Sequence, residues 1–259
     1  MVTTFPGTTR AETISGIPVS VDIRTALPRR ELAPLLDDAF AWLRWVDETF
    51  SPARADSQIG RLNGGRTIEQ IPELVEVLHR CDALSERTGG WFEARINGVI
   101  DPSGYIKGWA LERLSRALTN AGAVDHRLDA GGDIRLRGSA APGRPWRTAI
   151  RDPRSGLPRR TVAAYDLAIA TSGGAPVLNP RTGGRQSWPG AVTVVGPDLG
   201  VADAYATAMY AMGPVLARRF ATELAEAEPY QTLVIGRDGK EVATPGFAAY
   251  TVAEDRLVG

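Results

Sequence analysis

The stretch Val124-Asp-His-Arg-Leu-Asp-Ala-Gly-Gly-Asp-Ile-Arg-Leu-Arg137 decides the fold class of this chain. Two strand-like runs, 124–128 and 133–137, lie on either side of a glycine pair, and a predicted helix at about 106–120 precedes them. More strand-like runs follow without a helix between each pair of strands. Because regular alternation of strands and helices is missing, the sequence predicts an α+β fold rather than a doubly wound parallel sheet.

The chain before this stretch contains one clear strand and two long helices. Residues 17–24 alternate between apolar and polar side chains, as a half-buried strand does. Pro28 suits the start of a helix, which we predict to run to about Phe50 because its apolar residues follow helical spacing. A further predicted helix, 71–87, ends before a glycine pair, and glycine commonly terminates helices.

The chain after the stretch is dominated by strands. The strand-like runs are 146–151, 162–170, 191–195, 231–235 and 247–252. One long helix is predicted between the third and fourth of these runs, at about 202–226. The loop 138–144 is rich in Gly, Pro and Ala, which makes it a candidate seam between two halves of the chain.

Composition limits the classes of function. Among 259 residues, 30 basic and 30 acidic side chains cancel, which argues against sequence-independent binding of nucleic acid. The single cysteine, Cys81, excludes an intramolecular disulfide, and its spacing on the predicted helix is typical of a core residue. No apolar run reaches the roughly 18 residues of a membrane span. Because residues 1–10 lack the pattern of a secretory signal, we expect a cytoplasmic protein.

The most recognisable routes to catalysis are missing from the sequence. It contains no Walker phosphate loop, no HExxH zinc motif and no G-x-S-x-G nucleophile motif. Its two histidines, His79 on a predicted helix and His126 in a predicted strand, are more typical of exposed or structural positions than of a catalytic base. Histidine chemistry is therefore severely limited.

Two glycine-containing segments are candidates for contact with a phosphate group. The first, Asp101-Pro-Ser-Gly-Tyr-Ile-Lys-Gly-Trp109, leads into a predicted helix, where exposed backbone amides and Lys107 suit an anion. A simple helix cap by Asp101 or Ser103 explains this segment as well. The second, Asp129-Ala-Gly-Gly-Asp133, permits close approach of the backbone to a ligand, and a plain hairpin or bulge explains its glycines equally well.

Two segments nearer the C-terminus carry hydroxyl and carboxylate groups. The loop from Thr171 to Gly183 combines hydroxyls, glycines and an arginine, a composition as typical of an ordinary surface loop as of a phosphate-contacting one. Asp203 and Thr207 are four residues apart and share one face of the long predicted helix. Such oxygen donors suit Mg²⁺. The alternative is an acidic residue favoured by the positive end of the helix dipole, beside a threonine that is merely packed.

The order of these segments resembles one known family from end to end. In chain order the matching motifs are Phe50-Ser51, Asp56-Ser57, Leu62-Asn63, Thr88-Gly-Gly-Trp-Phe-Glu93, Asp101 with Lys107-Gly108, Ala130-Gly-Gly-Asp133, Thr171-Ser-Gly173, Pro180-Arg-Thr-Gly183, and Ala202-Asp203 with Thr207-Ala208. Over about residues 11–215 they resemble the FAD:protein FMN transferase (ApbE) family. The form Asp-Pro-Ser-Gly-x-x-Lys-Gly-Trp-Ala is similar to that of actinobacterial members.

The resemblance implies a fold and an activity. The fold is α+β and related to the T-fold, with two similar mixed α/β halves in one compact unit. We expect a single domain over 11–259, preceded by a disordered segment, 1–10. Members bind FAD with a divalent cation, usually Mg²⁺, and Mn²⁺ is the alternative here. They cleave the pyrophosphate, release AMP and link FMN to a Thr or Ser of a target flavoprotein, so the expected partners are FAD and such an acceptor, with no nucleic acid and no membrane span.

Site residues carry over by position in the motifs. The resemblance implies Asp203, Thr207 and Lys107 as catalytic residues. It implies Asp203, Thr207 and the backbone carbonyl of Ile106 as metal ligands. It implies contacts with FAD from Trp91, Phe92, Glu93, Ser103, Lys107, Trp109, Thr171, Ser172 and Val177. In this arrangement Mg²⁺ would neutralise a bridging phosphate, while Lys107 and backbone amides would hold the phosphates.

Several positions depart from the family pattern. Ser15-Gly16-Ile17 stands where Met-Gly-Thr is usual, and Ala53 stands where an aromatic residue commonly lies against the flavin. Pro176 and Asn179 replace the His and Asp of His-x-x-Asp-Pro. That histidine is the candidate general base, and loss of a general base typically costs about 10²–10⁴ in rate. Two alternatives to the transferase therefore stay open: a non-catalytic flavin- or nucleotide-binding homologue, and an FAD pyrophosphatase that gives FMN and AMP.

Overall fold

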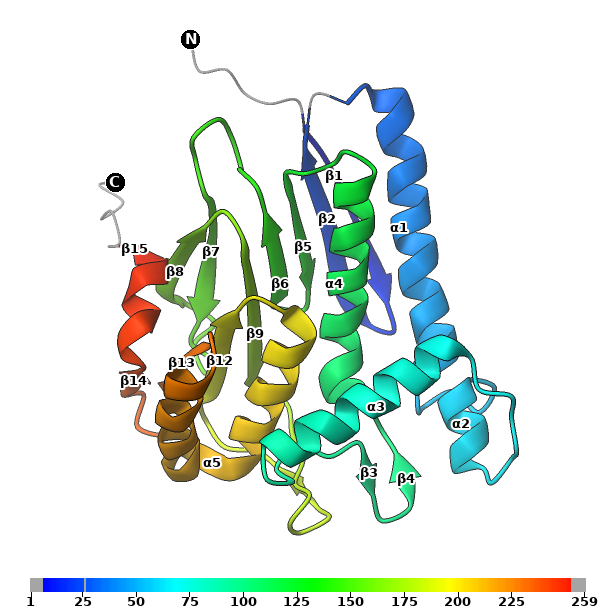
Figure 1. Cartoon of the computed structure of the whole chain (residues 1–259). Helices are drawn as coiled ribbons and strands as arrows, with labels where there is room; N and C mark the ends of the chain where they lie inside the picture. Colours follow the sequence, from blue (N-terminus) through cyan, green and yellow to red (C-terminus); the bar gives the residue numbers. More distant parts are fainter. Residues whose placement is uncertain (1–6, 26, 253–259) are drawn as a thin grey trace.

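An eight-stranded antiparallel sheet runs through the molecule and carries three long helices on one of its faces (Figure 1). The structure is a computed structural model that describes residues 7–25 and 27–252. The strands of the sheet, in spatial order, are β1 Gly7–Ile14, β2 Ile17–Arg24, β5 His126–Ala130, β6 Asp133–Arg137, β9 Leu167–Gly173, β12 Ala191–Gly196, β13 Gln231–Ile235 and β14 Glu241–Ala243. The helices on its face are α1 Arg29–Phe50, α4 Ser103–Asn120 and α5 Leu199–Ala227.

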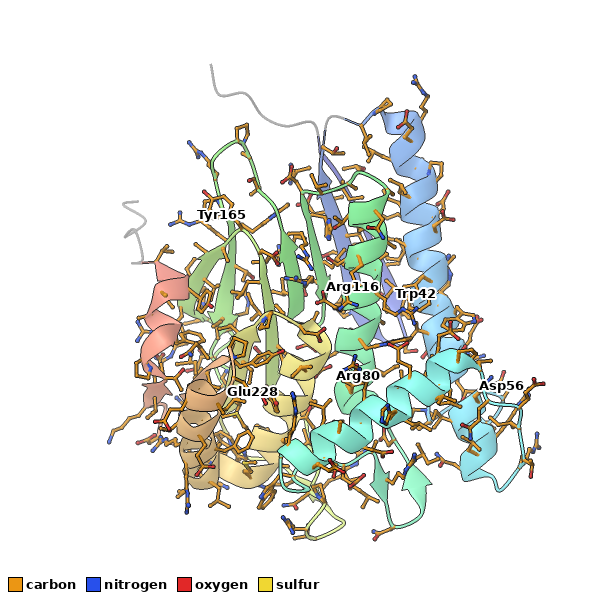
Figure 2. The ribbon with its side chains drawn as sticks, in the orientation of Figure 1. Trp42, Asp56, Arg80, Arg116, Tyr165 and Glu228 are labelled. Atoms are coloured by element: carbon orange, nitrogen blue, oxygen red, sulfur yellow. The ribbon has the colours of Figure 1, made fainter. Side chains whose placement is uncertain are left out.

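Smaller elements fill the connections. Between α1 and α4 in the chain lie α2 Gln58–Asn63, α3 Pro72–Arg87, β3 Arg95–Ile96 and β4 Val99–Ile100. A second short hairpin is made of β10 Val177–Leu178 and β11 Arg185–Gln186. A separate three-stranded sheet has the order β15 Thr251–Val252, β8 Pro158–Ala164 and β7 Trp146–Arg151. A short 3₁₀ helix, η1 Pro245–Tyr250, precedes β15 in the chain. Figure 2 shows Trp42 between α1 and α4, where its Nε1 donates to the carbonyl oxygen of Ala110 at 3.0 Å.

The two halves of the large sheet repeat one order of elements. Each half runs strand, strand, helix, helix, strand, strand: first β1-β2-α1-α4-β5-β6, then β9-β12, the two segments of α5, and β13-β14. The halves join where β6 pairs with β9, with Ile134 opposite Ile169. The loop 138–144 leads from the first half into the three-stranded sheet. This architecture confirms the predicted α+β fold.

The strand β12 in the second half of the sheet is buried on both of its faces. All six residues of β12 are buried. Val192 and Val194 belong to the core under the helices, whereas Val195 belongs to a second core that also contains Trp146 of the three-stranded sheet. A strand that faces two cores needs a continuous apolar run, and this explains why β12 lacks the alternating pattern of β2.

The helices α4 and α5 cross at backbone contact, and glycine makes this crossing possible. A Cβ atom at Gly108 would lie 2.4 Å from the carbonyl oxygen of Leu199. One turn earlier, a Cβ atom at Gly104 would lie 3.0 Å from the side chain of Thr207. The first distance is too short for a side chain, so position 108 admits only hydrogen without a shift of the helices, and the second is a tight contact that Thr207 would have to relieve. The first turns of α4 are thereby held against the first turns of α5.

The helix α5 is broken at Gly213-Pro214, although the sequence predicts one continuous helix. Gly213 has a φ of 75°, and Pro214 has no N–H to donate, so the helical hydrogen bonds stop there. Beside the break, the carbonyl oxygen of Ala211 accepts a hydrogen bond from Nδ2 of Asn179 at 3.4 Å. The loop that contains Asn179 is therefore attached to α5 at this break.

Two predicted strands are wrong in detail. The run 162–170 is two strands, β8 and β9, separated by the exposed pair Tyr165-Asp166, because the chain passes there from the small sheet to the large one (Figure 2). The run 247–252 is mostly the 3₁₀ helix η1, which begins at Pro245, and only its last two residues are extended. A proline at the first position favours such a helical turn over a strand.

The N-terminal expectation is wrong over residues 7–10, which form the first half of β1 instead of a disordered segment. Their pairing with β2, which places Gly7 opposite Arg24, fixes them. Residues 1–6 lie outside the described residues. That 11–259 is a single domain stays a prediction, which the continuous sheet supports. Within the described ranges, no helix has both the length and the apolar character that crossing a membrane requires.

Candidate active site

A cavity of about 620 Å³ lies between the C-terminal half of α1, the first turns of α4 and α5, and the β1-β2 and β10-β11 hairpins. Eleven of the twelve predicted site residues line it: Trp91, Phe92, Glu93, Ser103, Ile106, Lys107, Thr171, Ser172, Val177, Asp203 and Thr207. Its volume is in the range of small-molecule sites. The structure thus brings together residues that are more than one hundred positions apart in the sequence.

The first turns of α4 and α5 place oxygen donors side by side. Asp203 is 5% exposed, and its Oδ2 accepts a hydrogen bond from the backbone N–H of Gly108 at 3.3 Å. Thr207 lies one turn further along α5, with its Oγ1 3.4 Å from Oγ of Ser172. Ile106 lines the same cavity from the first turn of α4. A carboxylate and a hydroxyl next to main-chain groups suit a hard cation such as Mg²⁺ or Mn²⁺ better than a soft metal.

Two buried carboxylates beside one lysine leave an excess of negative charge beneath the cavity. Lys107 forms an ion pair with Asp133, which is 1% exposed and also accepts a hydrogen bond from the backbone N–H of Thr171 at 3.0 Å. Burial raises the pKa of Asp203 well above its usual range, and the neighbouring Asp133 raises it further, while Lys107 counteracts both. Among the described side chains Asp203 has no ion-pair partner. A bound divalent cation would supply the missing positive charge.

Lys107 keeps its positive charge in this setting. Burial lowers the pKa of its ammonium group, but the attraction of Asp203 and Asp133 outweighs burial, so the pKa of Lys107 is raised overall. The side chain is held by Asp133 and lines the cavity. It is therefore a fixed cation next to the pair Asp203 and Thr207, which is where a phosphate oxygen could be held.

An aromatic wall follows α3. Trp91 and Phe92 line the cavity from the turn after this helix. Glu93, which also lines it, accepts a hydrogen bond at Oε2 from Oγ of Ser85 at 2.9 Å, and this bond holds the segment to α3. The guanidinium of Arg181 lies 5.3 Å from the centre of the Trp91 ring. A planar face of this kind suits a ring ligand.

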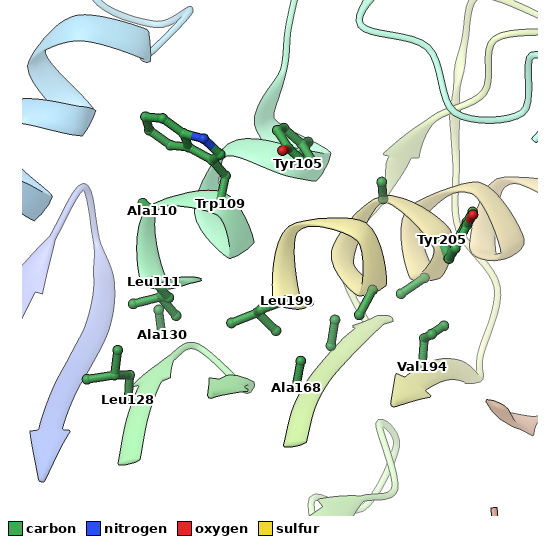
Figure 3. Packing of buried hydrophobic residues seen from close by; sticks show 14 of the residues in the cluster. Tyr105, Trp109, Ala110, Leu111, Leu128, Ala130, Ala168, Val194, Leu199 and Tyr205 are labelled. Carbon is green, nitrogen blue, oxygen red and sulfur yellow. The ribbon is translucent and has the colours of Figure 1, made fainter. Parts of the chain in front are cut away.

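Trp109 lies outside the cavity, although the resemblance implies a contact between it and FAD. It is 4% exposed, its ring centroid is 5.6 Å from that of Trp42, and its Nε1 donates to Oε1 of Glu76 at 3.0 Å. Figure 3 shows Trp109 and Leu111 on different sides of α4. Residues two apart on an α-helix point about 200° apart, so Trp109 cannot share the direction of Lys107. Its place is the core between α1 and α4.

The β10-β11 hairpin closes the cavity on the side where the family pattern has its histidine. Pro176 lines the cavity there, and its side chain can neither donate nor accept a proton. Asn179 is 6% exposed; its Oδ1 accepts a hydrogen bond from the backbone N–H of Arg181 at 2.9 Å, and its Nδ2 donates to Ala211 at the break in α5. Asn179 therefore holds the hairpin to α5 and is not part of the cavity wall.

Neither histidine of the chain reaches the cavity. His126 is fully buried, and its ring nitrogens lie 2.7 Å from the carbonyl oxygen of Ala123 and 2.7 Å from Oγ of Ser115. Burial lowers the pKa of His126 to about 4, so the ring is neutral. His79 is exposed on α3, and the buried Cys81 has its thiol pKa raised by burial to about 12. The expected structural roles of these residues are confirmed.

The cavity also contains polar residues that are not among the predicted site residues. Ser15 and Asp47 line it and are joined by a hydrogen bond from the serine hydroxyl to the carboxylate. Arg185 lines it as the first residue of β11. A Ser-Gly turn between two alternating runs would have signalled the β1-β2 hairpin and placed Ser15. No local pattern marks Asp47 or Arg185, because only the tertiary fold brings them to the cavity.

Comparison with known proteins relates the chain to one family. The sequence model of the ApbE family matches residues 15–101 and 95–230. The FAD:protein FMN transferase of Vibrio cholerae is 31% identical over 169 residues, which are 58% of this chain and 49% of that protein. The FAD:protein FMN transferase of Escherichia coli K12 is 26% identical over 217 residues, which are 72% of this chain and 61% of that protein. The chain thus spans about half to three-fifths of the length of these curated relatives.

Solved structures share the fold. The flavin transferase ApbE from Vibrio cholerae superposes with a TM-score of 0.78 at 22% sequence identity, covering 95% of this chain and 99% of that one. The ApbE protein from Thermotoga maritima superposes with a TM-score of 0.84 at 19% identity, covering 96% and 100%. The mixed α/β arrangement with antiparallel sheets is therefore that of the ApbE structures.

Proposed function

Because this chain belongs to the ApbE family, we propose that it transfers FMN from FAD to a Thr or Ser of a target flavoprotein and releases AMP. One observation carries the proposal: Asp203 and Thr207 stand against the first turns of α4 in a cavity lined by nearly all residues that the family pattern implies. Asp203 has no ion-pair partner among the described side chains, which leaves its carboxylate available to a divalent cation.

Mg²⁺ is the metal that we propose for this site, with Mn²⁺ as the alternative. Asp203, Thr207 and the backbone carbonyl of Ile106 would hold it. Few protein ligands are needed, because Mg²⁺ commonly binds one or two carboxylates together with substrate phosphates and water. The metal would neutralise a bridging phosphate and withdraw charge from the departing AMP.

Lys107 would bind a phosphate oxygen beside the metal. It is charged, and its ion pair with the buried Asp133 fixes its position before FAD arrives. Thr171 and Ser172 line the cavity from β9 and offer hydroxyls to the same phosphates. Groups that are already oriented stabilise the charge that develops on the phosphate oxygens without rearranging in the transition state.

The acceptor hydroxyl would lose its proton without help from a histidine. Pro176 occupies the expected position, and both histidines lie elsewhere. Phosphoryl transfer relies mostly on positioning and electrostatic stabilisation, so the reaction is slowed rather than abolished. The second candidate is an FAD pyrophosphatase, in which water takes the place of the protein hydroxyl as the acceptor.

The experiment that tests the proposal is chromatography of FAD reactions with the purified protein, with Mg²⁺ and with EDTA, in the presence and absence of a family-type acceptor peptide. We expect AMP release that depends on Mg²⁺ and peptide-bound FMN that is seen by mass spectrometry. Asp203→Asn should abolish both. Asp238→Asn, at an exposed aspartate outside the cavity, is the matched control and should retain them.

The other outcomes separate the alternatives. AMP and free FMN without modified peptide would identify a pyrophosphatase. Binding of FAD without any AMP would identify a non-catalytic homologue. AMP release that persists in Asp203→Asn would reject the metal assignment. A cytoplasmic location and the absence of nucleic-acid partners stay predictions from composition.

A further inference from the structure

The turn of the β10-β11 hairpin is attached to two other parts of the chain. Asn179 holds it to α5 at Ala211. Two residues further on, Arg181 donates to the carbonyl oxygen of Gly89 and lies over the ring of Trp91. The hairpin therefore connects the second half of the chain to the turn after α3, and residues that it points at the cavity have a defined position.

Arg185 is the cationic residue that this hairpin brings to the cavity. The strand register places Arg185 opposite Leu178, and its Nη1 donates to the carbonyl oxygen of Pro176 at 3.4 Å. The exposed Arg185 is thereby held beside Pro176, the residue that replaces the family's histidine. It lines the cavity, and among the described residues it has no carboxylate partner.

Its neighbour Arg181 shows the difference between a structural arginine and a free one. Arg181 is committed to Gly89 and to the ring of Trp91. Within the part of the chain that the structure describes, the exposed Arg185 uses one of its five N–H donors, weakly, and the other donors can reach a ligand. A planar fork of donors is matched to a phosphate group.

We propose that Arg185 is a catalytic residue that binds the pyrophosphate of FAD from the β10-β11 hairpin. The inference rests on the proposed function, which supplies the substrate. Arg185 does not belong to any of the motifs that the chain shares with the family pattern.

The chemistry of the step decides what Arg185 contributes. The acceptor oxygen forms a bond to the FMN phosphorus, and the bond from that phosphorus to the oxygen of AMP breaks. The hydroxyl proton passes to water, and AMP leaves with the bonding electron pair. Arginine keeps its proton at all relevant pH values, so it does not replace the lost base. It stabilises the negative charge that gathers on the phosphate oxygens as the bond to AMP breaks.

The first test measures binding, independently of turnover. Wild-type protein, Arg185→Gln and Arg185→Lys are titrated with FAD and with riboflavin, which lacks phosphates, by flavin fluorescence in EDTA. We expect the Kd for FAD to rise about 10- to 100-fold in Arg185→Gln and less in Arg185→Lys, with the riboflavin Kd unchanged. Inorganic pyrophosphate should raise the thermal midpoint of the wild type and not that of Arg185→Gln.

The second test measures turnover with Mg²⁺. AMP release should fall about 10²- to 10³-fold in Arg185→Gln and recover in part in Arg185→Lys. Arg147→Gln, at an exposed arginine of β7 outside the cavity, is the matched control and should behave like the wild type. FAD binding and AMP release at wild-type levels in Arg185→Gln would overturn the inference, and so would equal weakening of FAD and riboflavin.

These measurements separate the inference from the proposed function. A wild type that releases no AMP but loses FAD binding on Arg185→Gln would reject the transferase and support the phosphate contact. A wild type that releases AMP, with Arg185→Gln equally active, would support the transferase and reject the role of Arg185.

Discussion

Oδ2 of Asp203 lies 3.3 Å from the backbone nitrogen of Gly108, so a hydrogen bond joins the helix α5 of one half to the helix α4 of the other. The contact exists because position 108 carries no side chain. A Cβ atom there would lie 2.4 Å from the carbonyl oxygen of Leu199. The close approach of α4 and α5 therefore also sets the position of Asp203, the candidate metal ligand.

Gly108→Ala is expected to damage stability and site together. The added methyl group must push α4 and α5 apart, and overpacking of this kind typically costs about 1–3 kcal/mol. We expect a lower free energy of unfolding in urea and loss of the stabilisation that Mg²⁺ gives the wild type. Gly184→Ala is the control, because its nearest neighbour would be 3.7 Å away. Equal behaviour of the two variants would contradict the tight crossing.

Asp203→Asn is expected to stabilise the metal-free protein. Asparagine keeps the size and an acceptor oxygen but removes a charge whose burial raises the pKa of Asp203. In EDTA we expect a higher thermal midpoint by calorimetry, by roughly 2–4 °C for each kcal/mol gained. Mg²⁺ should raise the midpoint of the wild type only. A midpoint below that of the wild type in EDTA would mean that the charge is already compensated.

Mild acid is expected to destabilise the protein through His126. Its ordinary pKa is about 6.5, and burial lowers it to about 4 in the folded state. Between these values the unfolded chain binds more protons, so the free energy of unfolding falls as the pH falls, by about 3 kcal/mol in total. Denaturant unfolding at pH 7, 6 and 5 measures this slope.

The matched variants for this slope are His126→Asn and His79→Asn. The first removes the buried titrating group and should flatten the pH dependence, even though it also loses the bond to Ser115. The second changes an exposed histidine and should leave the slope as it is. A slope that survives in His126→Asn would assign the acid sensitivity to other groups.

Pro176→His is expected to accelerate transfer to a hydroxyl acceptor. The side chain would stand at the cavity wall on the β10-β11 hairpin and could accept the hydroxyl proton. We expect peptide flavinylation to rise about 10- to 100-fold, toward the gain typical of a general base. The rate should acquire a pH dependence near 6.5, which the wild type lacks. An unchanged rate and a flat profile would show that the acceptor binds elsewhere.

Elements with a strong local pattern could be predicted from the sequence. The strands Ile17–Arg24, Asp133–Arg137, Trp146–Arg151 and Gln231–Ile235 have the predicted bounds. Their apolar residues and the turn residues beside them are enough to place them. The strand β1 is not predicted because its half-buried side carries Thr8, Arg10 and Glu12 in place of apolar residues, and its position depends on β2.

Features set by tertiary contacts could not be predicted in this way. The resemblance implies a contact between Trp109 and FAD, but helical geometry turns the Trp109 side chain into the core. The break in α5 follows from Gly213-Pro214, yet its value as an attachment for Asn179 appears only in three dimensions. The strands of the β10-β11 hairpin have two residues each and leave no periodicity to recognise, so Arg185 was missed.

The two halves of the sheet together form one cavity. Lys107 comes from the first half and Asp203 from the second, so neither half encloses a whole cavity. If the two halves were separate chains, they would have to associate, and dilution would dissociate them. In one chain the effective concentration of each half relative to the other is on the order of mM. In a symmetric dimer both halves would have the same sequence, so each would need both the carboxylate that binds the cation and the lysine. In a single chain the two halves can differ, and here Asp203 lies in the second half and Lys107 in the first.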